Sequence, residues 1–95
     1  MSTTTDERTF SVSETAKMFD RSVPWLRWRE KNGDFIHEDG SQIEIARTTP
    51  RRAKYGYRRY TVQNILDMAD ALDREKKITA LEAERVRTLV RAYQT

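Results

Sequence analysis

The stretch FSVSETAKMFDRSVPWLRWREKNG, residues 10–33, decides the fold of this chain because it contains two helix starts and two helix stops. In its first half, Ser11 and Glu14 have the spacing of a capping box, in which each side chain bonds the backbone N–H of the other residue. The residues that follow place apolar side chains on one face of a short helix. Asp20-Arg21 interrupts that face, so we expect the first helix to end there.

The second half of the stretch predicts another helix. Ser22 is its cap candidate, and Pro24 lies in its first turn, where a missing N–H costs little. We expect this helix to run from about Val23 to Lys31 and to stop at Asn32-Gly33, because glycine readily adopts the left-handed conformation that ends helices. Two short helices joined by a turn of two or three residues have helix-turn-helix spacing, here over residues 11–32. A basic second helix with two tryptophans is typical of a recognition helix.

The middle of the chain changes to a strand-like pattern. Residues 35–37 and 42–45 predict short strands, and Asp39-Gly40 between them predicts a hairpin turn. Residues 48–56 are expected to form a basic loop, and residues 57–60 alternate aromatic and basic side chains like a returning strand. A hairpin with a basic tip after a helix pair predicts a wing over residues 35–60. Tyr60 is expected to pack beneath the helix that follows.

Two further helices are predicted at residues 61–77 and 79–94. Thr61 and Thr79 are the expected caps, and Glu82 completes a capping box with Thr79. Each segment carries an apolar stripe with helical spacing. Residues 1–8 are polar and are expected to form a flexible arm. The prediction is therefore an α+β, mainly α fold, with one winged helix-turn-helix domain over residues 9–95.

The positive charge is concentrated in two windows. The chain has 95 residues and a net charge of +3, but residues 21–31 alone carry +3 and residues 47–59 carry +6 with no acidic residue. The remaining residues therefore carry −6. A basic field with interleaved aromatic residues attracts polyanions, and nucleic acid is the usual one. Neither window is an amphipathic helix with an apolar face, which argues against a membrane-surface role.

Composition also excludes several classes of function. With no cysteine and a single histidine, His37, the chain offers neither a disulfide framework nor a multi-histidine zinc site. No apolar run approaches the ~20 residues that span a bilayer, and the start is not a signal peptide, so we expect a soluble cytoplasmic protein without a membrane partner. No nucleophilic, metal-binding or phosphate-loop pattern is present, and we expect neither an enzyme nor a cofactor. Three aspartates recur every third residue in the third predicted helix: Asp67, Asp70 and Asp73. They most simply form a solvated face, or alternatively a surface for a basic partner.

Three motifs resemble MerR-type winged-helix proteins, in the order in which that family has them. They are residues 10–17 (FSVSETAK), residues 22–30 (SVPWLRWRE) and residues 56–61 (GYRRYT). The chain differs from full-length MerR regulators because it lacks their long dimerising helix and a ligand-binding domain, and its wing region is longer. A free-standing domain of this size is similar to the small phage excisionases, the recombination directionality factors.

The resemblance implies a DNA-bending architectural factor in the host bacterial cytoplasm. Such a factor would bind attachment-site repeats in double-stranded DNA beside a tyrosine integrase, and would direct recombination toward prophage excision. It also implies cooperative, head-to-tail contacts between neighbouring protomers. We further expect a monomer in the absence of DNA, because the chain has no long heptad seam.

Candidate contact residues come from the second helix and the wing. Arg27 is the best candidate for a base or nearby phosphate contact, and Arg29 is expected to touch a phosphate or nothing. One of the two tryptophans is expected to pack under the wing and the other to face DNA. Wing arginines favour narrow minor grooves, and the resemblance assigns a phosphate contact to Arg58. The full set of predicted DNA-binding residues is Ser22, Trp25, Arg27, Trp28, Arg29, Arg51, Arg52, Lys54, Tyr55, Arg58 and Arg59.

Two other functions remain open at this point. A small transcriptional regulator with the same fold would bind an operator instead of an attachment site. A protein–protein adaptor would use its acidic helices as the active surface, and its binding to DNA would be absent or insensitive to salt. Sequence alone does not separate these functions from the excisionase hypothesis.

Overall fold

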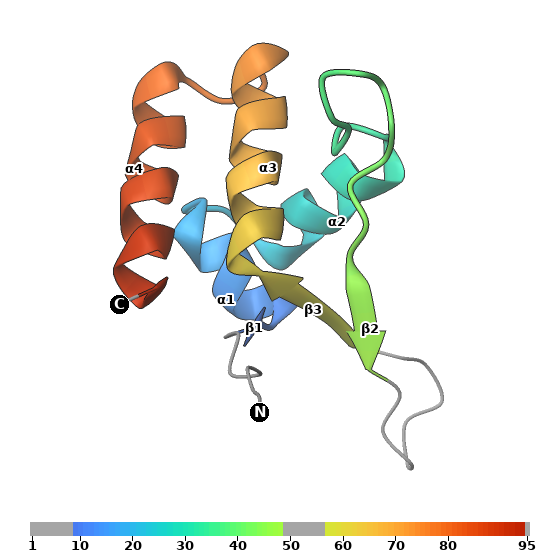
Figure 1. The fold of residues 1–95 in the computed structure, drawn as a ribbon, viewed down its shortest axis with the longest axis vertical. Helices are drawn as coiled ribbons and strands as arrows, with labels where there is room; N and C mark the ends of the chain where they lie inside the picture. Colours follow the sequence, from blue (N-terminus) through green and yellow to red (C-terminus); the bar gives the residue numbers. More distant parts are fainter. Residues whose placement is uncertain (1–8, 49–56, 95) are drawn as a thin grey trace, which may run out of the picture.

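The protein is a mainly helical α+β domain in the computed structural model, which describes residues 9–48 and 57–94 (Figure 1). Its elements in chain order are β1 (Thr9–Phe10), α1 (Val12–Met18), α2 (Val23–Lys31), β2 (Ala46–Thr48), β3 (Tyr57–Thr61), α3 (Val62–Arg74), α4 (Ala80–Arg91) and a final 3-10 helix (Ala92–Gln94). The four helices were all expected from the sequence. Among the described helices, none has the length and apolarity to cross a membrane.

Hydrogen bonds to capping side chains fix the first residues of the helices, at the positions that the sequence predicts. A complete capping box is formed by Ser11 with Glu14, by Thr61 with Asn64, and by Thr79 with Glu82. Each cap satisfies backbone N–H groups that the first turn of a helix leaves without a partner. The backbone N–H of Thr79 donates to Glu82 at 2.9 Å and, as the main cause, holds the pKa of that carboxyl below its usual value.

The first three helices, α1, α2 and α3, each end at a backbone reversal with positive φ. Asp20 (φ 57°) follows α1 and Gly33 (φ 83°) follows α2, as the sequence predicted. The third helix ends three residues before its predicted end, because Lys76 adopts φ 59°. There the N–H of Lys77 turns back to the carbonyl of Leu72 at 2.8 Å, which closes a Schellman motif.

The sheet is three-stranded and antiparallel, in the order β1-β3-β2. Phe10 pairs with Tyr60, which ties the start of the chain to the strand that leads into α3. In Figure 1, β2 and β3 run out from the base of α3 on the side away from α4. The sheet therefore places the hairpin on the side of the molecule opposite to α4.

The strands predicted at residues 35–37 and 42–45 are wrong. The structure has only an isolated bridge there, between Ile36 and Gln42. Phe35 and Ile43 are both buried in the core, so this segment follows the core surface instead of extending as a ladder. The Asp39-Gly40 turn does form, with Gly40 at φ 91°. The hydroxyl of Ser41 donates to Asp39, which is the main reason that the pKa of this carboxyl lies below its ordinary value.

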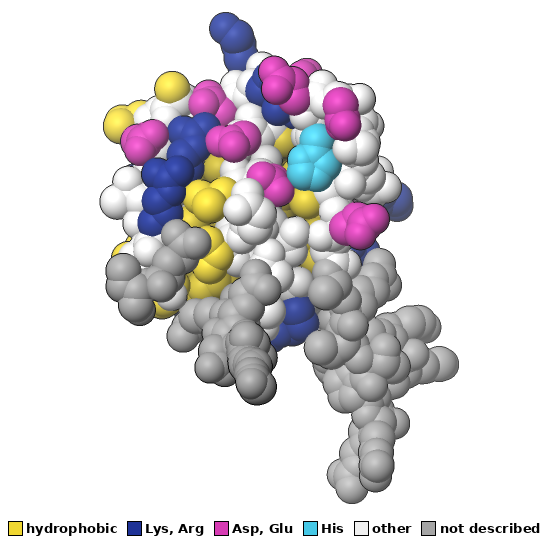
Figure 2. All heavy atoms as spheres, viewed as in Figure 1, with side chains coloured by type: hydrophobic (Ala, Val, Ile, Leu, Met, Phe, Trp, Pro, Cys, Tyr) yellow, Lys and Arg dark blue, Asp and Glu magenta, His cyan; other side chains and the backbone are white. Residues whose placement is uncertain are grey.

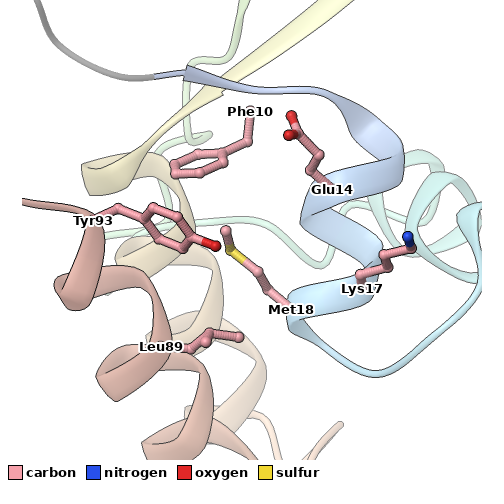
Figure 3. A pocket seen from close by; sticks show the side chains of 6 residues that line it. All are labelled: Phe10, Glu14, Lys17, Met18, Leu89 and Tyr93. Carbon is pink, nitrogen blue, oxygen red and sulfur yellow. The ribbon is translucent and has the colours of Figure 1, made fainter.

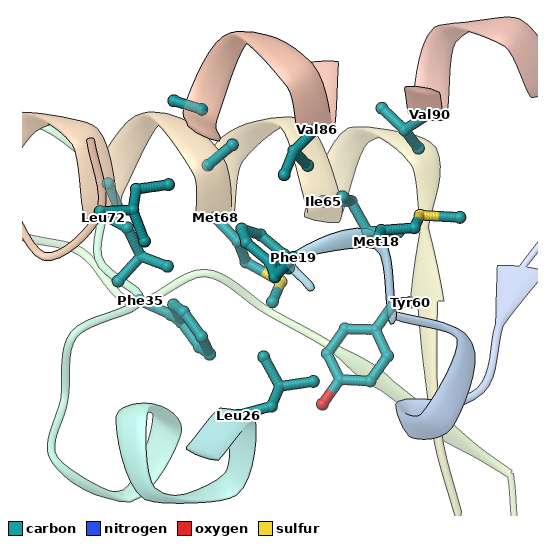
Figure 4. Packing of buried hydrophobic residues seen from close by; sticks show 14 of the residues in the cluster. Met18, Phe19, Leu26, Phe35, Tyr60, Ile65, Met68, Leu72, Val86 and Val90 are labelled. Carbon is teal, nitrogen blue, oxygen red and sulfur yellow. The ribbon is translucent and has the colours of Figure 1, made fainter. Parts of the chain in front are cut away.

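The core lies around α3. Figure 4 shows Val86 and Val90 of α4 between α4 and α3, whereas Leu26 of α2 and Tyr60 of β3 lie on the other side of α3. All four side chains are essentially buried. The expected packing role of Tyr60 is confirmed, and Leu26 fixes which face of α2 turns inward.

The acidic side chains of α3 do not form a simple solvated face. Arg87 of α4 pairs with Asp70 at 2.7 Å and with Asp73 at 3.2 Å. Hydrogen bonding to Asp70 is the main cause that raises the pKa of Arg87 above its usual value. These carboxylates therefore join α3 to α4. On the face shown in Figure 2, acidic side chains are scattered over α3, α4 and the segment that follows α2, and a row of basic side chains lies among them.

Candidate nucleic-acid interface

The outward face of α2 carries a stripe of exposed residues, which we call the α2 stripe. Its members follow helical spacing and are Pro24, Arg27, Trp28 and Lys31. On the inward side of the helix, Leu26 has no exposed surface and Val23 packs partly against the core. Burial of Leu26 therefore turns the α2 stripe toward solvent.

Two basic residues of the α2 stripe keep their charge available. Within residues 9–48 and 57–94, neither Arg27 nor Lys31 forms an ion pair, and both are exposed. Lys31 lies one turn after Arg27, so the two cations stand on the same side of the helix. Lys31 belongs to the predicted basic window but is not among the predicted DNA contacts, although its four-residue spacing from Arg27 indicates a shared helix face.

Arg29 lies in a different environment from Arg27. Its guanidinium donates to the carboxylate of Asp34 at 3.0 Å, and the amide of Asn32 donates to the other oxygen of that carboxylate at 3.2 Å. The side chains of Arg29 and Asp34 are only 18% and 10% exposed. The ion pair therefore joins α2 to the segment that follows it, and this occupies the Arg29 charge.

The two tryptophans separate into a packed one and an exposed one. Trp25 packs against Phe19 at the end of α1, with ring centroids 6.0 Å apart, and not under the hairpin as expected. Trp28 is 55% exposed. The guanidinium of Arg29 lies 5.0 Å from the Trp28 ring and 5.6 Å from the Trp25 ring. Trp28 is therefore the tryptophan that is open to a ligand.

The beginning of α2 is fixed by Arg21 and Ser22. The hydroxyl of Ser22 accepts a hydrogen bond from the N–H of Trp25 at 3.3 Å, so this predicted contact residue is the N-cap of α2. Arg21 pairs with Glu82 of α4 at 2.8 Å and lies 5.3 Å from the Trp25 ring. Both residues therefore stabilise the position of the helix.

The described part of the hairpin is joined to α2 and β1. Arg58 forms an ion pair with Glu30 of α2. Arg59, on the next position of β3, donates to the hydroxyl of Thr9 at 3.1 Å and to its carbonyl at 3.3 Å. Both arginines are half-buried. The remaining predicted hairpin contacts, Arg51, Arg52, Lys54 and Tyr55, lie outside the described residues.

A pocket lies between α1 and the end of α4 (Figure 3). It is lined by Phe10, Glu14, Lys17, Met18, Leu89 and Tyr93. Its lining is mostly apolar and includes none of the predicted contact residues. In the described part of the chain, no group of three or more His, Cys, Asp or Glu side chains could hold a metal ion.

The fold and the α2 stripe define a small, mainly helical α+β domain with an exposed basic and aromatic helix face. A family model described as a domain of unknown function (DUF7229) matches residues 1–93, so the chain belongs to that family. No curated protein and no solved structure gives a significant match.

Proposed function

We propose that the chain binds double-stranded DNA as a winged helix-turn-helix protein of excisionase type. In this proposal α1 and α2 are the helix-turn-helix, α2 enters the major groove, and the β2–β3 hairpin is the wing. The major groove admits a helix and displays a distinct donor and acceptor pattern for each base pair. The wing would follow the backbone or an adjacent minor groove.

The observation that carries the proposal is the α2 stripe. Arg27 and Lys31 remain without an acidic partner among the described residues, whereas Arg29, Arg21 and Arg58 are all paired. An exposed arginine can bond a guanine edge with two hydrogen bonds, and a lysine can meet a phosphate. Two exposed cations beside an exposed indole on one helix face fit a polyanionic ligand.

The β2–β3 hairpin is a second observation in favour of DNA binding at the α2 stripe. The Arg58–Glu30 ion pair joins β3 to α2, so a ligand along α2 would meet the hairpin next. By sequence, the window over residues 47–59 holds six basic residues and no acidic one. This window would supply the sequence-independent contacts to phosphates that give most of the affinity in DNA binding.

The resemblance to excisionases indicates the biological process in which the proposed DNA binding would take part. It supports an architectural factor that binds attachment-site repeats cooperatively, bends the DNA and acts with a tyrosine integrase. An excision reaction in vitro with the cognate integrase tests the proposed role in excision. Addition of the protein should stimulate excision. DNA binding without stimulation would instead favour an operator-binding regulator.

A salt titration tests DNA binding itself. Fluorescence anisotropy with a labelled duplex should give affinity that falls steeply as salt rises. If six to eight cations meet phosphates, the slope of log K against log salt is roughly −5 to −7. Absent or salt-insensitive binding would contradict the proposal and favour a protein–protein adaptor.

A further inference from the structure

Arginine and tryptophan side chains from Arg21, just before α2, and from α2 itself alternate in a series of guanidinium-to-ring contacts. The order is Arg21, Trp25, Arg29 and Trp28, with guanidinium-to-ring distances of 5.3, 5.6 and 5.0 Å. These distances lie within the range of cation–π attraction. Trp25 is anchored on Phe19, and Trp28 is the solvent-exposed end of the series.

Trp28 is held by partners that are themselves fixed. The Asp34 side chain is only 10% exposed and accepts a hydrogen bond from the Arg29 guanidinium, which lies over the Trp28 ring. The Nε atom of Arg29 is buried and has no acceptor among the described residues, so the guanidinium is oriented by Asp34 and the rings. The guanidinium contact restrains an exposed aromatic ring before any ligand binds, which lowers the entropy cost of binding.

We propose that Trp28 contacts the 5-methyl group of thymine in the major groove, and that Arg29 is a positioning residue that holds the indole for this contact. The inference rests on the proposed function. Trp28 shares the exposed face of α2 with Arg27 and Lys31, so a groove that receives these cations would also meet the ring. The thymine methyl is the apolar group that the major groove displays.

The experiment compares thymine with uracil in an otherwise identical duplex. A preferred site is first selected from a random DNA pool with the full chain. The site is then amplified with either dTTP or dUTP, which removes every 5-methyl group without changing base pairing. The wild-type chain should bind the thymine duplex about fourfold more tightly for each methyl contacted, the value expected for burial of one methylene-sized group.

Three variants separate the methyl contact from other roles of Trp28. Trp28→Ala should bind both duplexes equally, whereas Trp28→Phe should keep most of the thymine preference because it keeps an apolar ring. Leu81→Ala is the matched control, because Leu81 is an 80% exposed apolar residue on α4. It should keep the full preference.

Two results would overturn the contact. One is equal binding of both duplexes by the wild-type chain. The other is loss of as much affinity in Trp28→Phe as in Trp28→Ala, with no thymine preference, which would indicate an indole N–H bond to a phosphate. Failure of the proposed function is distinguishable, because the wild-type chain would then bind neither duplex.

Asp34→Asn tests the positioning role of Arg29. This variant keeps the guanidinium but removes the charge that orients it, so the thymine preference should fall. A purely structural role would alter thermal stability without altering the preference. Full retention of the preference in a folded Asp34→Asn variant would refute the positioning role.

Discussion

Replacement of Glu30 by Gln should tighten DNA binding, although Glu30 lies on the helix that we propose to enter the groove. The Glu30 carboxylate forms an ion pair with Arg58, and the two side chains are 16% and 30% exposed. The pair therefore presents no net charge to a phosphate. Glutamine keeps the size of the side chain and its capacity to accept a hydrogen bond, but releases one positive charge at the junction of α2 and β3.

The magnitude follows from counterion release. One additional cation that meets a phosphate changes the slope of log K against log salt by about −0.9. Between 200 mM and 50 mM salt, this amounts to about a threefold larger gain in affinity for Glu30→Gln than for the wild-type chain. The partly exposed ion pair is worth about 1 kcal/mol of stability, which corresponds to a fall in Tm of about 4–8 °C for a domain of this size.

The assay is a salt titration of anisotropy with wild-type chain, Glu30→Gln and a charge-matched control. Glu84→Gln serves as the control, because it also raises the net charge by one, but on exposed α4, where Glu84 bonds Arg87 at 3.3 Å. Its slope should equal that of the wild-type chain. Equal effects of the two substitutions would refute the reasoning, since only the net charge would then matter. An unchanged slope in Glu30→Gln would place Arg58 away from the DNA.

Three shorter predictions follow from other contacts. Arg27→Ala should weaken binding to a selected site more than binding to random DNA, with no change in Tm; equal losses would make Arg27 a phosphate contact only. Arg29→Ala should lower the free energy of unfolding by about 2 kcal/mol in urea, because the carboxylate of Asp34 loses its charged partner; unchanged stability with a smaller salt slope would make Arg29 a phosphate contact. Glu82 has a lowered pKa, so its contribution to stability is present above its ordinary value of 4.5 and is lost as the pH falls through the folded value. The stability difference between wild-type chain and Glu82→Gln, measured by thermal unfolding, should therefore shrink as the pH falls below 4.5, and a difference that stays constant through this range would contradict this.

Local signals in the sequence were sufficient for the helix starts. Each capping box spans only four residues, so Ser11, Thr61 and Thr79 could be identified without knowledge of the fold. The strands predicted at residues 35–37 and 42–45 failed for the opposite reason. The turn between them is local and does form, but a strand also needs a neighbouring strand, and the core takes Phe35 and Ile43 instead.

Partners distant in the chain decided which basic residues are available. Arg21 and Glu82 are 61 positions apart, and no pattern in the sequence joins them. Arg58 of β3 and Glu30 of α2 likewise form an ion pair across elements that are distant in the chain. Charge counts along the chain therefore predict a basic region but do not show which cations are already paired.

The ion pairs indicate how many cations α2 and the β2–β3 hairpin can each contribute to the proposed DNA binding. In the window over residues 21–31, Arg21 and Arg29 are paired, which leaves Arg27 and Lys31 on the α2 stripe. Two cations account for only about two units of salt slope, so in the proposed complex residues 47–59 would supply most of the remaining phosphate contacts. A variant with both Arg27→Ala and Lys31→Ala should accordingly keep much of its affinity for random DNA and lose its preference for a selected site. If this variant lost its affinity for random DNA as well as its preference for a selected site, at constant Tm, α2 would be the main source of affinity and the hairpin a minor contact.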